Sequence, residues 1–277
     1  MGTHWQIDTL EELDIEIRGA LRTVIADYDQ GFSRFRQDSV VSQAGAVPGY
    51  YRLPQAAASL EPLYRSLYRL TEGAMTPLIT GSLEHLGYDA DYTLRAQPGF
   101  LPSPDWAEAI DWHGTRLQTK QPVVLDVGAA GKGQLVDLLA AELERHGVGN
   151  YVIDASGDLF AQGLTLRVGL EHPLDPSTAI GVVELDHGYP AICASASNRR
   201  SWGAGLHHVL DGSTGKPVQT VLASWALAQD AMQADALATA LFFTDHATLA
   251  KEFDFASVRM FSTGRAEISD NFDGEIF

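Results

Sequence analysis

Two oxygen-bearing side chains lie one helical turn apart in the apolar segment "DAMQADALATALFF", residues 230–243. Positions i and i+4 share a helix face, so the Asp235 carboxylate and the Thr239 hydroxyl can converge on one point. Such oxygens suit a hard cation such as Mg²⁺, which keeps waters and takes further oxygens from backbone or phosphate groups. The alternative is a solvated Asp235 beside a threonine that bonds back to its own helix. Taken alone, the pair favours this alternative, although Asp235 would need a compensating partner if it is buried.

A glycine-rich stretch, "LDVGAAGKGQLVD" at residues 125–137, has the composition of a turn that leads from a strand into a helix. Its glycines allow close backbone approach, and the helix would begin near Lys132 with free N–H groups and a positive dipole end. That combination suits a phosphate group. The glycine spacing matches neither a Walker loop nor a dinucleotide-binding fingerprint. The alternative is a tight turn that carries a solvated lysine.

Two further segments place polar side chains next to flexible turns. In "HHVLDGSTGKP", residues 207–217, strand alternation puts His208 on one face, where it either acts as a general base or makes a structural contact with Asp211. In "ASGDLF", Asp158 follows a Ser-Gly pair and either meets a ligand or caps the turn. Taken alone, neither segment decides between these interpretations.

The elements that position these residues are long helices and runs of adjacent strands. Apolar stripes predict helices within residues 10–29 and across Leu60, Leu63, Leu67 and Leu70, and the glycine-rich stretch continues into a helix that ends near 147. We predict strands or hairpins at the following segments: 109–119, 122–128, 150–163, 164–172, 179–188, 189–197, 206–212, 223–228 and 257–272. This pattern predicts an α+β fold with a largely antiparallel sheet. We expect a single domain over residues 1–277, with 88–107 as a loop-like insertion.

Composition limits the classes of function. The formal charge of −17 argues against a general nucleic-acid binder, because phosphate contacts need clustered lysine and arginine. Cys193 is the only cysteine, which excludes an intramolecular disulfide and a thiolate metal cluster. No apolar stretch reaches the length of a membrane span. The N-terminal segment does not resemble a signal peptide, so we expect a cytoplasmic chain as written, or an exported, periplasmic one if a leader was removed.

Read together and in order, these segments resemble the ApbE family of FAD:protein FMN transferases. The resemblance extends from about residue 1 to about residue 245 and rests on seven segments: "MGTHW", "FSRFRQDSVVSQ", "TEGAMTPLI", "LDVGAAGKGQLVD", "ASGDLFAQG", "HHVLDGSTGKP" and "ADALATALFF". The chain departs from the family pattern at Thr76, where the family has an acid, at Gly212, where it has proline, and at Ser156, where it has glycine.

The resemblance implies a T-fold-like architecture and a reaction. Family members bind FAD and Mg²⁺ and transfer FMN to a Thr or Ser hydroxyl of an acceptor flavoprotein, at a Ser/Thr-Gly-Ala-Thr-like motif, with release of AMP. Carried over, Asp235 and Thr239 hold the metal together with a backbone oxygen of Ala129, and His208 is the base. The implied FAD pocket comprises Gly73, Ala74, Met75, Gly131, Lys132, Gly157, Asp158, Ser195 and His208.

Two other functions are compatible with the same residues. An FAD pyrophosphatase would use the same metal site with water as nucleophile and yield FMN and AMP. A non-catalytic FAD-binding protein would keep the pocket without the reaction. The presence of Asp235, Thr239 and His208 favours the transferase over the binding protein.

Overall fold

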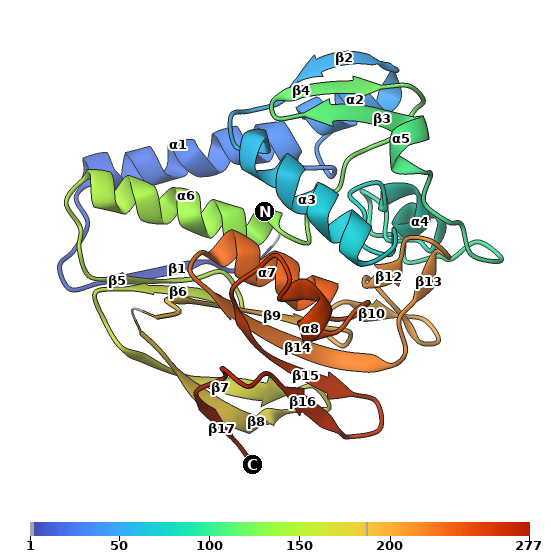
Figure 1. Cartoon of the computed structure of the whole chain (residues 1–277). Coiled ribbons are helices and arrows are strands. Elements are labelled where there is room, and N and C mark those ends of the chain that lie inside the picture. The colour runs from blue at the N-terminus through green and yellow to red at the C-terminus, as the bar shows by residue number, and fades with distance from the viewer. Residues whose placement is uncertain (1–2, 187) are drawn as a thin grey trace. The chain divides into compact units, whose positions relative to one another are not determined.

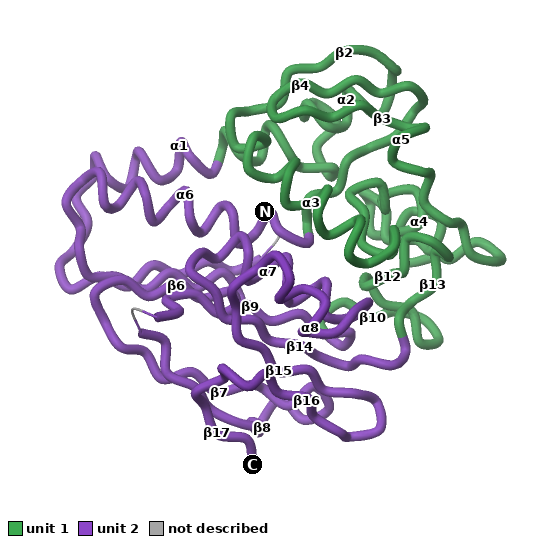
Figure 2. Tube along the Cα trace, in the orientation of Figure 1, with its two compact units in different colours: residues 1, 26–128, 199–218 green, residues 2–25, 129–198, 219–277 purple. Residues whose placement is uncertain are grey.

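The computed structural model describes residues 3–186 and 188–277 and divides into two compact units. Figure 2 shows the division: unit 1 contains residues 26–128 and 199–218, and unit 2 contains the remainder of the described chain. The expected single domain over 1–277 stays a prediction.

Unit 2 is built on a seven-stranded sheet in which every neighbouring pair is antiparallel. In spatial order the strands are β1 (Gln6–Thr9), β5 (Tyr151–Asp154), β6 (Asp158–Gln162), β9 (Ala191–Ala196), β14 (Val221–Ala228), β15 (Ala256–Phe261) and β16 (Ala266–Ile268). Together with the helices below, this sheet confirms the predicted α+β fold with a largely antiparallel sheet.

The two faces of this sheet are covered differently (Figure 1). Helices α6 (Gly131–Arg145) and α7 (Ala231–Ala240) pack on one face, against β5, β6, β9 and β14. On the other face lies an antiparallel three-stranded sheet of β7 (Leu166–His172), β8 (Asp175–Leu185) and β17 (Gly274–Ile276), with an apolar core between the sheets. The short helix α8 (His246–Leu249) precedes β15. Strand β14 is buried along nearly its whole length, as expected for a strand covered on both faces.

The N-terminal helix begins later than the apolar stripe predicted. Helix α1 (Ile15–Phe32) starts after Asp14, whose carboxylate accepts a hydrogen bond from the N–H of Ile17 at 2.8 Å and so caps the helix. Leu10, which the stripe included, lies outside the helix and is 74% exposed. Strand β1 precedes the helix and was not predicted, because its four residues show little apolar alternation.

Unit 1 combines short helices with small sheets. Its three-stranded antiparallel sheet has the order β2-β4-β3, and β10 pairs with β11 and β12 with β13. The bounds are α2 (Val40–Ala46), β2 (Gly49–Arg52), α3 (Ala57–Leu70), α4 (Thr80–His85), α5 (Trp106–Ala109), β3 (Ile110–His113), β4 (Arg116–Thr119), β10 (Ser201–Trp202), β11 (Leu206–His207), β12 (Leu210–Asp211) and β13 (Lys216–Pro217). The predicted helix that carries Leu60 to Leu70 and the hairpin at 109–119 are confirmed.

The predicted buried strand at residues 122–128 is wrong, because the segment forms no strand. Asp126 instead organises it: its Oδ1 accepts a hydrogen bond from the N–H of Gly128 at 2.7 Å, and its Oδ2 lies 2.7 Å from Nε of the buried Arg34. Side-chain bonds to the backbone compete with strand pairing in this way. Residues 88–105 also carry no helix or strand, whereas the end of the predicted loop, 106–107, is helical.

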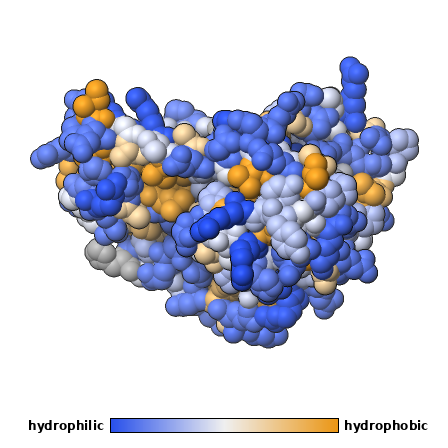
Figure 3. All heavy atoms as spheres, turned by 90° about the horizontal axis from the view of Figure 1, so that it is seen from above, coloured by the Kyte–Doolittle hydropathy of each residue, from blue (hydrophilic) through white to orange (hydrophobic). Residues whose placement is uncertain are grey.

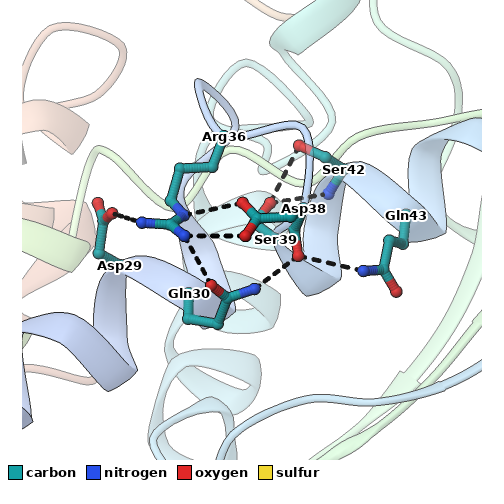
Figure 4. Close-up of polar contacts among 7 residues, drawn as sticks. All are labelled: Asp29, Gln30, Arg36, Asp38, Ser39, Ser42 and Gln43. Atoms are coloured by element: carbon teal, nitrogen blue, oxygen red, sulfur yellow. Dashed lines mark hydrogen bonds and ion pairs between the residues drawn. The ribbon is translucent and has the colours of Figure 1, made fainter.

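Figure 4 shows the polar contacts that hold the chain between α1 and α2 in unit 1. The guanidinium of Arg36 binds Asp38 through Nε at 3.1 Å and Nη2 at 2.9 Å, and it reaches Asp29 at 3.1 Å. Arg36 lowers the pKa of Asp38 through its hydrogen bonds. Next in sequence, Ser39 caps α2 by accepting from the N–H of Ser42 at 3.2 Å. The "FSRFRQDSVVSQ" segment is therefore a structural connection with a defined conformation.

The surface seen from above is mainly hydrophilic, and its apolar areas are small and separated (Figure 3). Among the helices that the structure describes, none combines the length and apolar character that crossing a bilayer requires.

Candidate active site

Asp235 is buried in unit 2, with 3% of its surface exposed, and its partner is a backbone amide. The Oδ2 atom accepts a hydrogen bond from the N–H of Gly133 at 3.0 Å. Gly133 is the third residue of α6, so its N–H has no acceptor within its own helix. The N-cap position, Ala130, supplies no side-chain acceptor. Asp235 therefore caps α6 from α7, where the negative charge also meets the positive end of the helix dipole.

Gly133 marks the closest approach of the two helices. A Cβ atom at this position would lie 2.0 Å from the carbonyl oxygen of Ala231 and 2.8 Å from Cβ of Asp235. Only glycine fits without moving a backbone, because contacts below 3.0 Å to backbone atoms are not tolerated. The second glycine of "GKG" is thus needed for packing between helices.

Lys132 forms an ion pair with Asp158, which begins strand β6. The Asp158 side chain is fully buried, so it cannot face solvent. Burial and the charge of Asp235 raise the pKa of Asp158 to about 7, while Lys132 opposes the shift. Burial lowers the pKa of Lys132, but the carboxylates of Asp158 and Asp235 outweigh it and raise the value overall. Lys132 therefore stays protonated within a cluster that has an excess of carboxylates.

Thr239 points at a second hydroxyl. Its Oγ1 lies 3.0 Å from Oγ of Ser195, on strand β9. The alternative drawn from the sequence, a threonine bonded back to its own helix, is not the contact seen here. Two predicted site residues that are 44 positions apart in the chain thus meet through their hydroxyls.

The remaining predicted residues of unit 2 lie at turns beside these contacts. Ala129 is half-buried in the turn before α6, and Gly131 is the first residue of that helix. Gly157 has a φ of +101° in the turn between β5 and β6, a conformation that favours glycine. Ser156 also has a positive φ, +60°, and its hydroxyl donates to the carbonyl of His4 at 2.8 Å. Serine thus replaces the family's glycine in a strained backbone position that its own hydrogen bond supports.

The predicted residues of unit 1 gather around a different turn. Gly73 and Ala74 follow α3, and the N–H of Gly212 donates to the carbonyl of Ala74 at 2.8 Å. A Cβ at Gly212 would lie 2.5 Å from Cγ2 of Thr76. The departures from the family pattern at 76 and 212 therefore pack against each other. Met75 is 3% exposed, which makes it a core side chain of this unit.

His208 lies between β11 and β12 and is half-buried; its N–H donates to the carbonyl of Arg200 at 3.3 Å. The predicted continuous strand over 206–212 is wrong, because residues 208 and 209 interrupt it. Its neighbour His207 is buried, with Nε2 2.9 Å from the carbonyl oxygen of Val218, and burial lowers its pKa. His207 therefore has a structural role.

The structure also identifies a residue that motif reasoning passed over. Asp137 of α6 accepts hydrogen bonds from the N–H groups of Ala231 at 2.8 Å and Met232 at 2.9 Å, the first two residues of α7. Burial raises its pKa to about 7, against these two donors, which lower it. The signal was available: Asp137 is a carboxylate inside an apolar helical stretch, as Asp235 is.

Comparison with known proteins decides the family. The sequence profile of the ApbE family matches residues 1–256. The chain belongs to the ApbE family. The resemblance inferred from the seven segments is confirmed.

Relatives and solved structures of the ApbE family agree with this assignment. The chain is 27% identical to the FAD:protein FMN transferase of Escherichia coli (strain K12) over 271 residues, covering 87% of this chain and 75% of the relative. The ApbE protein of Thermotoga maritima has the same fold, with a TM-score of 0.80, 23% identity and coverage of 97% and 94% of the two chains. The flavin transferase ApbE of Vibrio cholerae follows with a TM-score of 0.78, 19% identity and coverage of 98% and 95%.

Proposed function

We propose that this protein transfers FMN from FAD to a Thr or Ser hydroxyl of an acceptor flavoprotein and releases AMP. The family assignment supports flavin transfer, because curated ApbE relatives carry that activity in their names. The observation that carries the proposal is the convergence of three family segments in unit 2. Asp235 accepts the Gly133 N–H, and Lys132 forms an ion pair with Asp158. In a third pair, Thr239, on the same helix as Asp235, contacts the hydroxyl of Ser195 on β9.

The donor set fits Mg²⁺. Asp235 and Thr239 would hold the ion with a backbone oxygen of Ala129, an all-oxygen set of the kind that Mg²⁺ prefers. Within the described residues no three His, Cys, Asp or Glu side chains gather as a metal site, so a cation here would keep waters or take phosphate oxygens. Asp235 is buried and has no ion-pair partner among the residues that the structure describes, whereas Lys132 compensates the charge of Asp158, so the carboxylate that would face a cation here is that of Asp235. When bound, Mg²⁺ would neutralise charge on the FAD pyrophosphate.

In the proposed reaction the acceptor hydroxyl oxygen forms a bond to the phosphorus on the FMN side of the pyrophosphate. The bond from that phosphorus to the bridging oxygen breaks, and AMP leaves with this oxygen. His208 takes the hydroxyl proton as general base. Lys132, which stays protonated, supplies positive charge near the flavin nucleotide. The acceptor would present a Ser/Thr-Gly-Ala-Thr-like motif.

Intact-protein mass spectrometry of an acceptor domain that carries this motif tests the proposal. Incubation with this protein, FAD and Mg²⁺ should add the mass of one FMN and release AMP in equal amount. Removal of the metal with EDTA should abolish the transfer, and added Mg²⁺ should restore it. AMP and free FMN without a modified acceptor would instead identify a pyrophosphatase, and FAD binding without turnover would identify a non-catalytic binding protein.

Replacement of His208 by alanine is expected to lower the transfer rate by about 100-fold or more, since a positioned general base contributes roughly 10²–10⁴-fold. Free imidazole should restore part of the lost rate, because it supplies the missing base. The rate is followed by acceptor mass at saturating FAD. His113, which is exposed, serves as the control, and its alanine variant should keep the full rate. A His208→Ala protein with the wild-type rate would remove this residue from the mechanism.

A further inference from the structure

We propose that Asp137 is a positioning residue that sets the register of α7 against α6 and thereby places Asp235 and Thr239. This inference deepens the proposed function and rests on it only for the effect on catalysis. Asp137 touches neither Asp235 nor Thr239 in any contact described above. It acts through the backbone of the helix that carries them.

The contact between the two helices is reciprocal. The Asp235 carboxylate of α7 accepts the Gly133 N–H at the start of α6, and the Asp137 carboxylate of α6 accepts two N–H groups at the start of α7. Each helix thus caps the other's N-terminus. Gly133 and Asp137 are four residues apart and share one face of α6. Along α6 the contacts advance from Gly133 to Asp137, and along α7 their partners run back from Asp235 to Ala231. The two helices are therefore fixed against each other at two points one turn apart.

The capping of α7 is complete only with Asp137. Asp230, the N-cap of the helix, accepts the N–H of Gln233 at 2.8 Å and leaves the N–H groups of Ala231 and Met232 to Asp137. Both carboxylates stabilise the same helix end through hydrogen bonds and the dipole. They differ in one respect: Asp230 belongs to α7, whereas Asp137 belongs to α6. Of these two capping carboxylates, only Asp137 therefore restrains the position of α7 against α6.

Further side-chain contacts of α7 hold it to the sheet and not to α6, and one of them lies at its start, where the Cys193 thiol of β9 donates to the Ala231 carbonyl at 3.5 Å. Ser224 of β14 donates to the Ala238 carbonyl, and Arg259 of β15 donates to the carbonyls of Leu241 at 3.2 Å and Thr244 at 2.6 Å. These hold the C-terminal half and the end of α7 on the sheet. The N-terminal half, which leads into Asp235, is tied to α6 by the Asp137 carboxylate. Loss of Asp137 should therefore let the first turn shift and weaken the Asp235–Gly133 hydrogen bond.

The test compares Asp137→Asn with Asp230→Ala, which also removes a cap from α7 but leaves α6 untouched. Amide-resolved hydrogen exchange on the free protein measures the protection of the Gly133 N–H, normalised to the core amide of Trp225. In Asp137→Asn one amide oxygen replaces the two carboxylate oxygens that accept the Ala231 and Met232 N–H groups, and the amide NH2 faces the other N–H. The Gly133 amide should then exchange at least about tenfold faster, because its acceptor on α7 is displaced. In Asp230→Ala it should stay within about threefold of the wild type. Equal Gly133 exchange in the two variants would overturn the proposal.

A second measurement links the register to the cation. The transfer rate is measured as a function of Mg²⁺ concentration. In Asp137→Asn, either the half-saturating Mg²⁺ concentration should rise or the maximal rate should fall, by about 10- to 100-fold. Changes of this size are usual when a residue that orients metal ligands is replaced. Asp230→Ala should keep the wild-type Mg²⁺ dependence, and an equal change in both variants would count against positioning by Asp137. A wild-type protein without transfer would refute the proposed function, while the exchange comparison would still decide the role of Asp137. If Asp137→Asn does not fold, Asp137→Glu gives the same comparison, because the added methylene displaces the carboxylate.

Discussion

Replacement of Asp235 by asparagine is expected to lower the rate of FMN transfer by at least about 100-fold while the protein stays folded. Losses of this size follow the removal of one group that stabilises charge in the transition state. The amide oxygen of asparagine can still accept the Gly133 N–H at 3.0 Å, so the cap on α6 is kept. The negative charge that would hold the cation is lost. Acceptor mass gives the rate, and far-ultraviolet circular dichroism gives the folded state.

Asp235→Ala separates the two roles of this carboxylate. It removes the charge and also the acceptor for Gly133, so it should lose the same activity and, in addition, about 1–2 kcal/mol of unfolding free energy, the usual cost of a lost helix cap. Asp230→Asn is the matched control, because it changes a carboxylate of the same segment to a residue that still caps well. Transfer by Asp235→Asn at the wild-type rate would rule out Asp235 as a metal ligand.

Replacement of Gly133 by alanine should lower the free energy of unfolding, whereas an ordinary glycine-to-alanine change in a helix raises it. Alanine normally stabilises a helix interior by about 1 kcal/mol. Here the new Cβ would meet the Ala231 carbonyl oxygen at 2.0 Å, so α7 must move away and the Asp235 hydrogen bond is lost. Overpacking lowers the free energy of unfolding by about 1–3 kcal/mol, and a buried polar group that loses its hydrogen-bond partner lowers it by a similar amount. We expect a net loss of roughly 2–4 kcal/mol, measured by urea unfolding.

Gly19 in α1 provides the control for this prediction. It is also a helical glycine, but apart from its chain neighbours and the backbone of its own helix no atom lies within 4 Å of the Cβ that alanine would add. Gly19→Ala should therefore raise the unfolding free energy by about 0.5–1 kcal/mol. Because the displaced α7 carries Asp235 and Thr239, Gly133→Ala should also lose FMN transfer under conditions where it remains folded. A Gly133→Ala protein as stable as Gly19→Ala would show that the two helices do not pack as described.

Local patterns along the chain were sufficient for the family and the type of fold. Helical and strand periodicity is a property of neighbouring residues, and it predicted α6, α7 and most strands of the main sheet. Where side chains bond to the backbone instead, as at Asp126, or where a strand is short and polar, as β1, the same reasoning failed. At such places the pattern no longer reports which face is buried.

The partners of the buried polar groups could not be obtained from such patterns. Asp235 was correctly expected to need compensation, but its partner, the Gly133 amide, lies 102 positions away in the chain, and Asp137 lies 94 positions from Ala231. Periodicity tells which face of a helix is buried, but which unsatisfied N–H meets which carboxylate depends on how two helices pack on the same sheet. Asp137 was overlooked for that reason. Its role follows from the meeting of two helix ends in the folded chain, where each end leaves N–H groups that its own helix cannot satisfy.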